Sequence, residues 1–79
     1  MEALVLGDIV LGRILFEEVF PDYTEHKLES TENGCLLIVA ENTDGRVVKA
    51  KFRREPSPTG SFLMMYDAFF GKYIKSVRI

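Results

Sequence analysis

The residues that most often carry covalent chemistry are scarce in this sequence. Its 79 residues include one histidine, His26, and one cysteine, Cys35. A thiolate activated by an imidazole needs the two side chains within hydrogen-bond reach. We expect them at opposite ends of one β-hairpin, about six residues apart at roughly 3.3 Å each, or about 20 Å. The sequence therefore predicts no nucleophilic dyad, and Cys35 is interpreted as a small buried apolar residue.

Residues that bind metals or phosphates are equally sparse. A structural zinc site draws its four ligands from cysteine and histidine, and this chain has one of each. Glu17, Glu18 and Asp22 come closest to an acidic cluster, but helical neighbours point about 100° apart, which favours a solvated helix end. No glycine-rich loop ends in the Lys-Ser/Thr pair that binds nucleotide phosphates. We therefore predict no catalytic residue, no metal site and no cofactor.

Lys49, Lys51 and Arg53 alternate along one segment and could place three positive charges on one face of a strand. Such a row could contact the phosphates of a nucleic acid. The alternative is that the charges protect an outer strand against pairing with other chains. The formal net charge is -2 and the two signs are interspersed, so no strong field attracts a polyanion. The sequence favours the protective role, and nucleic-acid binding stays as the alternative.

Two turn signals divide residues 26–54 into three runs of strand-forming residues. Asn33-Gly34 and Asp44-Gly45 are typical of two-residue hairpin loops, in which both central residues can need positive φ. Three antiparallel strands in a meander are therefore predicted. With both loops two residues long, one face of the sheet collects the apolar residues Leu28, Leu37, Val39, Val48, Ala50 and Phe52. The two turns agree on this register, and we predict that this face is the core.

A first helix is predicted before the strands. Asp8 as N-cap and Pro21 as the residue that ends the helix indicate a span from Ile9 to Phe20. Gly12 interrupts the pattern, so a strand through residues 4–11 stays possible.

A second helix is predicted after the Pro- and Gly-rich break at residues 55–60. From Ser61, a residue type that favours the N-cap, apolar residues recur at spacings of one and three as far as Val77. Phe69 and Phe70 lie on this apolar stripe and are expected in the core. The tail over residues 73–79 could instead form a short strand.

These elements predict one α+β domain over residues 1–79: a three-stranded antiparallel meander with helices packed on one face (αβββα, two layers). The same order of elements is found in the double-stranded-RNA-binding domain. The second helix of that family begins with a Lys-rich segment, whereas residues 58–65 contain no lysine. The comparison therefore concerns topology only and implies no shared function.

The compartment is predicted from the apolar segment Leu4–Phe20 and from the cysteine content. Four charged residues interrupt that segment before it reaches the roughly 20 apolar residues of a membrane span. A single cysteine cannot form an internal disulfide, which favours a reducing compartment. We expect a cytoplasmic protein.

The sheet face opposite the predicted core is mixed in character. In the predicted register an apolar strip on the central strand is flanked by charged residues, whose aliphatic stems could cover it. Contiguous apolar area bordered by charge also marks protein interfaces, and two adjacent methionines on the second helix could adapt to a partner. The predicted partner-binding residues are Leu36, Ile38, Ala40, Lys49, Lys51, Arg53, Met64 and Met65.

The function that the sequence favours is non-enzymatic protein binding. The chain would act as a self-associating accessory protein, or as an inhibitor that docks on a larger protein or nucleoprotein complex. One alternative is a nucleic-acid-binding module that uses the basic strand. A second alternative is a subunit that completes a shared active site.

Overall fold

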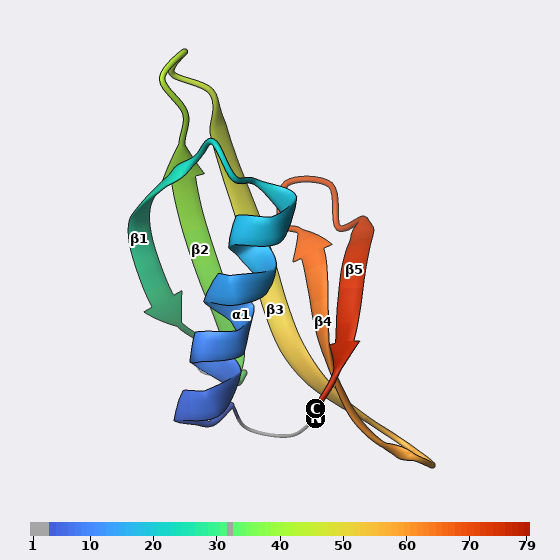
Figure 1. Ribbon diagram of the computed structural model, residues 1–79. Coiled ribbons are helices and arrows are strands. Elements are labelled where there is room, and N and C mark those ends of the chain that lie inside the picture. The colour runs from blue at the N-terminus through green and yellow to red at the C-terminus, as the bar shows by residue number, and fades with distance from the viewer. Residues whose placement is uncertain (1–3, 32) are drawn as a thin grey trace.

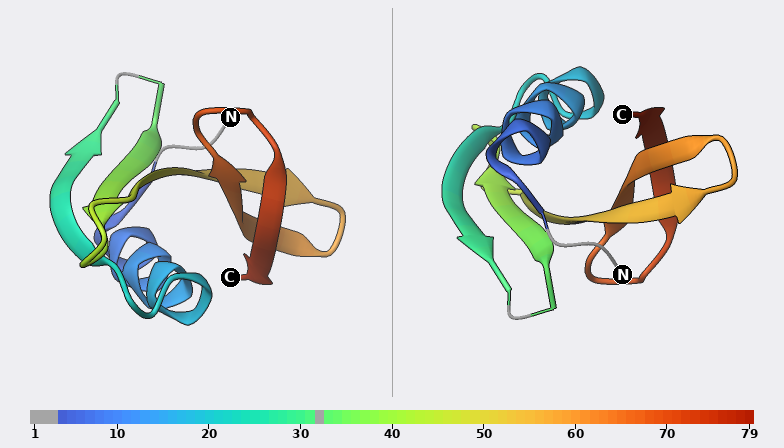
Figure 2. Two further views of the ribbon diagram at one scale, coloured as in Figure 1. Left: turned by 90° about the horizontal axis from the view of Figure 1, so that it is seen from above. Right: turned by 90° about the horizontal axis from the view of Figure 1, so that it is seen from below.

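The computed structural model describes residues 4–31 and 33–79, which form one helix and one antiparallel sheet (Figure 1). The sheet has five strands in the order β1-β2-β3-β4-β5, so each strand pairs with its neighbours in the chain. Figure 2 shows that the sheet curls and that the helix lies on its concave side. The elements are α1 (Leu6–Val19), β1 (Thr24–Ser30), β2 (Cys35–Glu41), β3 (Val47–Ser57), β4 (Gly60–Asp67) and β5 (Tyr73–Arg78).

The predicted αβββα fold is wrong, because the segment expected to be a second helix forms the hairpin β4–β5. Along β4, the side chains of Leu63 and Met65 are buried while the residues between and beyond them are partly exposed, which is the two-residue period of a strand. Large apolar residues occupy both faces of this strand, and their spacing therefore also fits a helix. Gly60, the first residue of β4, and Gly71, in the turn between β4 and β5, have φ of 140° and 69°, outside the helical region.

The predicted register is also wrong, because both early hairpin loops have three residues instead of two. The Thr31 N–H donates to the Cys35 carbonyl, and the Asn42 N–H donates to the Arg46 carbonyl. In each loop glycine is the third residue and has positive φ, 74° at Gly34 and 80° at Gly45. At residues 42–46 this is the loop in which a type I turn is followed by a left-handed residue.

Each loop shifts the pairing by one residue, and the two shifts compensate across the sheet. Ile38 pairs with Leu28 on one side and with Ala50 on the other. The members of the predicted core face that lie on β1 and β3 therefore face the core as expected: Leu28, Val48, Ala50 and Phe52. The central strand β2 presents its opposite face to the core, with Leu36, Ile38 and Ala40 in place of Leu37 and Val39.

The core lies between the concave face of the sheet and one side of α1. Its buried apolar residues are Leu15, Phe16, Leu36, Ile38, Ala40, Ala50, Phe52, Leu63 and Met65. They come from the helix and from β2, β3 and β4, so the buried apolar contacts lie between α1 and the three central strands. Free Cys35 is buried as predicted.

The predicted first helix is confirmed, with different ends. Val5 is the N-cap, and Asp8 lies three residues further on, where its Oδ2 accepts a hydrogen bond of 3.1 Å from the Val5 N–H. Asp8 therefore caps the helix from inside the first turn rather than as the N-cap itself. It is buried and its Oδ2 lies 3.5 Å from Nη1 of Arg54 on β3.

Two exposed ion pairs connect α1 to strands at opposite edges of the sheet. Arg13 pairs with Glu25 of β1 at 2.8 Å, and Glu18 pairs with Lys75 of β5 at 3.1 Å. The hydrogen bond from Arg13 lowers the pKa of the Glu25 carboxyl below its ordinary value. Exposed pairs stabilise a fold by at most about 1 kcal/mol, so apolar packing keeps the helix on the sheet.

Gly12 sets how closely α1 approaches the sheet. A Cβ at this position would lie 3.1 Å from Cδ2 of Leu36 and 3.6 Å from the Phe52 ring, whereas a Cβ at Gly7 would meet nothing within 4 Å. We expect Gly12→Leu to lower the free energy of unfolding by about 1–3 kcal/mol through overpacking. Gly7→Leu, the matched control in the same helix, should cost nothing. Urea denaturation measures both, and equal effects would contradict this packing.

Candidate interaction surface

Half of the predicted partner-binding residues are in the core. Leu36, Ile38, Ala40 and Met65 are at most 1% exposed, and they pack against one another and α1. The prediction that they form a surface is wrong, because the register shift turns β2 over and because Met65 lies on a strand. None of the four can touch a partner while the domain stays folded.

The other four predicted residues, Lys49, Lys51, Arg53 and Met64, lie on the opposite face of the sheet and are partly exposed. They alternate along β3 and β4 with buried residues. β3 is the middle strand of the sheet, so its positive charges do not protect an outer strand as the sequence suggested.

Arg53 is already engaged within the chain. Its Nη2 lies 2.8 Å from Oε1 of Glu55, and its guanidinium stacks over the Tyr66 ring at 5.0 Å from the centroid. A hydrogen bond of 3.2 Å to the Tyr66 hydroxyl raises the pKa of Arg53 above its ordinary value, and the Glu55 carboxylate acts in the same direction. Lys49 and Lys51 form no ion pair within residues 4–31 and 33–79.

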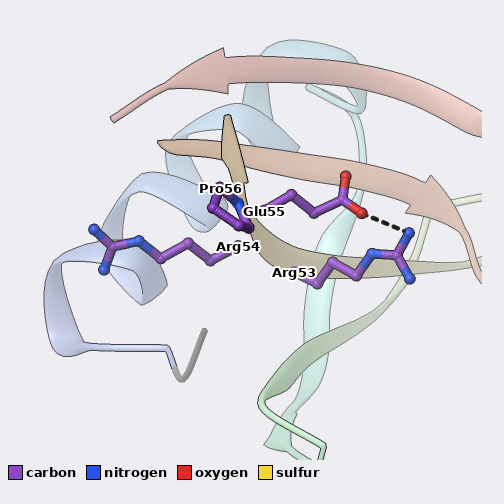
Figure 3. A pocket seen from close by; sticks show the side chains of 4 residues that line it. All are labelled: Arg53, Arg54, Glu55 and Pro56. Carbon is purple, nitrogen blue, oxygen red and sulfur yellow. Dashed lines mark ion pairs between the residues drawn. The ribbon is translucent and has the colours of Figure 1, made fainter. Parts of the chain in front are cut away.

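A hollow of about 450 Å³ beside β3 does not form a reactive centre. Figure 3 shows its lining side chains, with the guanidinium groups of Arg53 and Arg54 pointing in opposite directions. Arg53 pairs with Glu55, and Arg54 lies against Asp8. Because the charged groups diverge and are paired, no substrate could contact them together.

No metal-binding group of three or more histidine, cysteine or acidic side chains exists in the described part of the chain. His26 lies at the bulge between Glu25 and Lys27 in β1, and Cys35 is the first residue of β2. The pairing of these strands keeps the two side chains at opposite ends of the hairpin, which agrees with the prediction that they form no dyad.

The turn between β4 and β5 carries two exposed phenylalanines. Phe69 is 60% exposed and Phe70 is 78% exposed. The sequence predicted both in the core of a second helix, and this is wrong because they occupy the tip of a hairpin. Val47, at the start of β3, is a further exposed apolar residue beside them.

Hydrogen bonds fix this turn. Oδ1 of Asp67 accepts from the N–H of Phe69 at 2.8 Å and of Phe70 at 3.4 Å. The backbone adds bonds from Gly71 N–H to the Asp67 carbonyl, 2.7 Å, and from Ala68 N–H to the Lys49 carbonyl, 2.8 Å. The two phenyl rings are therefore presented by a turn that is tied to itself and to β3.

A hollow of about 320 Å³ lies next to these rings, beside the first residues of β3. Apolar side chains from four parts of the chain line it: Phe20, Tyr23, Val47, Val48, Phe69, Phe70 and Ile74. Its charged lining residues are Arg46, Lys49 and Asp67. We call the exposed Phe69, Phe70 and Val47 together with this hollow the aromatic surface.

A second exposed apolar group lies on α1. Leu6, Val10 and Ile14, each at least half exposed, are four residues apart and share one side of the helix. They are aliphatic and do not line the hollow of the aromatic surface. This stripe provides a control for the aromatic surface, since it exposes apolar area of another kind elsewhere.

Comparison of the chain with protein-family models, with curated proteins and with solved structures gives no match. Within the described residues no helix is both long and apolar enough to span a membrane. Any functional conclusion therefore depends on the surface features of this chain.

Proposed function

We propose that this chain is a non-enzymatic protein-binding module that docks on a larger protein through the aromatic surface. The observation that carries the proposal is the exposure of Phe69 and Phe70 on a hydrogen-bonded turn. Burying a phenylalanine side chain stabilises a fold by about 1.5–3 kcal/mol. A small domain that leaves two of them in water has that free energy available for binding.

The way in which the rings are held also supports binding. Side chains that dominate protein interfaces are large, are often aromatic and insert into pockets of the partner. Holding Phe69 and Phe70 in place before binding lowers the entropy lost on association. The turn that does so is closed by Asp67, whose carboxylate caps the N–H groups of both residues.

The basic strand supports nucleic-acid binding less well. Arg53 is neutralised by Glu55, and Lys27 lies 3.4 Å from Glu29 at the far side of the same face. Only Lys49 and Lys51 of that row have no ion pair in the described residues. Two lysines on a chain with net charge -2 provide few phosphate contacts.

The proposal predicts that Phe69→Ser/Phe70→Ser separates binding from folding. Both side chains are exposed, so the melting temperature should stay within a few degrees of the parent. A partner isolated from the source organism with the parent protein should bind the purified variant at least about 30-fold more weakly, the loss expected for one interface residue worth 2 kcal/mol. Isothermal titration calorimetry measures both dissociation constants.

Val10→Ser/Ile14→Ser is the matched control, because it removes exposed apolar area from α1 and leaves the aromatic surface intact. It should bind the partner like the parent. Loss of binding in the control but not in the phenylalanine variant would move the interface to the helix. Light scattering of the three proteins alone tests self-association, the other mode of action that the sequence favours.

A further inference from the structure

We infer that the aromatic surface recognises an acidic segment of its partner, in which a large apolar side chain is flanked by carboxylates. This inference rests on the proposed function and adds the chemistry of the partner. It follows from the charges that border the hollow, from its size, and from the hydrogen bonds that engage one of those charges.

Asp67, the one acidic residue that lines the hollow, already has partners in its own turn. Its Oδ1 accepts from two backbone N–H groups, and it closes the loop that carries Phe69 and Phe70. The two basic lining residues, Arg46 and Lys49, make no ion pair within the described residues. Two basic groups therefore stand against one carboxylate, and the charged residues that line the hollow carry a net charge of +1.

Apolar walls make these two charges more effective. Removing water from a site strengthens charge–charge attraction, because the effective dielectric constant falls well below that of water. A carboxylate held against Arg46 would in addition form charge-assisted hydrogen bonds, which are roughly twice as strong as neutral ones. An apolar partner residue in the hollow would bring neighbouring carboxylates to this border and exclude water from them.

The size of the hollow favours a side chain over a larger ligand. Small-molecule pockets usually enclose about 300–1,000 Å³, and this hollow of about 320 Å³ is at the lower limit. A single aromatic or branched aliphatic side chain is suited to such a space, with Phe69 and Phe70 packing beside it. The occupant is thus a short protein segment that combines one apolar residue with acidic neighbours.

The test is a selection from a random 12-residue peptide library displayed on phage. The parent protein is the bait, and Phe69→Ser/Phe70→Ser removes peptides that bind elsewhere. We expect the enriched peptides to contain an aromatic or large aliphatic residue with aspartate or glutamate within three positions. The most enriched peptide is then synthesised, and its dissociation constant is measured with each variant.

Arg46→Gln/Lys49→Gln should lower the affinity for this peptide at least tenfold and leave the melting temperature of the protein unchanged. Lys51→Gln is the matched control, since Lys51 is on the same strand and has no ion pair in the described residues, but does not line the hollow. It should change the affinity less than twofold. Raising the salt concentration from 50 to 500 mM should weaken the binding of the peptide to the parent protein, so that the dissociation constant approaches that of the Arg46→Gln/Lys49→Gln variant.

Each contrary outcome has a distinct meaning. If every peptide enriched on the parent protein is removed by the phenylalanine variant, the proposed function itself is overturned. Peptides whose binding needs Phe69 and Phe70 but that lack acidic residues would overturn only the inference. The same holds for peptides whose affinity is unchanged in Arg46→Gln/Lys49→Gln, and for a failure to enrich any peptide on the parent protein. Micromolar binding of a 20-nucleotide single-stranded DNA, weakened as much by Lys51→Gln as by Lys49→Gln, would replace the inference with nucleic-acid binding along β3.

Discussion

Ile38→Glu should unfold the protein, whereas Val39→Glu at the next position should leave it folded. Ile38 is 1% exposed and is surrounded by the core, where an unpaired carboxylate costs several kcal/mol. That is a large part of the 5–15 kcal/mol by which a typical domain is stable. The far-ultraviolet circular dichroism of Ile38→Glu should lose its cooperative thermal transition.

Val39 provides the control because it lies on the other face of the same strand. Its cross-strand neighbours are Lys27 on β1 and Lys49 on β3. A glutamate at position 39 would therefore stand between two positive charges, an arrangement that favours the sheet. If Val39→Glu unfolds and Ile38→Glu does not, β2 faces the other way and the two-residue loops are restored.

Phe52→Ala should also destabilise the domain severely, by about 3–5 kcal/mol. The Phe52 side chain has no exposed area and lies against the helix at Gly12. Phe70→Ala removes the same atoms from a residue that is 78% exposed and should change the free energy of unfolding by less than about 0.5 kcal/mol. Guanidinium denaturation of both variants gives the difference directly. Similar losses for the two would mean that the second half of the chain packs as a helix after all.

The early hairpins could be located from the sequence, but their register could not. The glycines at 34 and 45 mark the turns correctly. Two-residue and three-residue loops both place a glycine where φ is positive, and they differ by the one residue that decides which face of β2 is buried. Agreement between the two turns gave no independent check, because both loops are longer by the same amount.

The hairpin β4–β5 was hidden by the composition of its first strand. Phe62, Leu63, Met64, Met65 and Tyr66 are five consecutive large apolar residues, and such a run has neither a helical nor a strand period of its own. The available signals were the glycines on either side of this run and the aromatic residues Phe62 and Tyr66, a residue type that favours strands.

The aromatic surface could not be predicted, because the usual rule for aromatic residues fails there. Large apolar side chains are most often inside, so Phe69 and Phe70 were assigned to the core. Their exposure follows from the turn that Asp67 closes. Arg46 and Lys49 come beside them through the pairing of β3 with β4 and the bond from the Ala68 N–H to the Lys49 carbonyl.

The place of α1 in the chain determines when its apolar side can be covered. Consecutive strands joined by short loops can pair one hairpin at a time, and closing such loops costs little chain entropy. The helix has no such local partner, since Gly12 packs on Leu36 and Phe52, which lie 24 and 40 positions further along the chain. During synthesis, α1 thus leaves the ribosome before the strands that it covers, and its Leu15 and Phe16 stay uncovered until the sheet has formed.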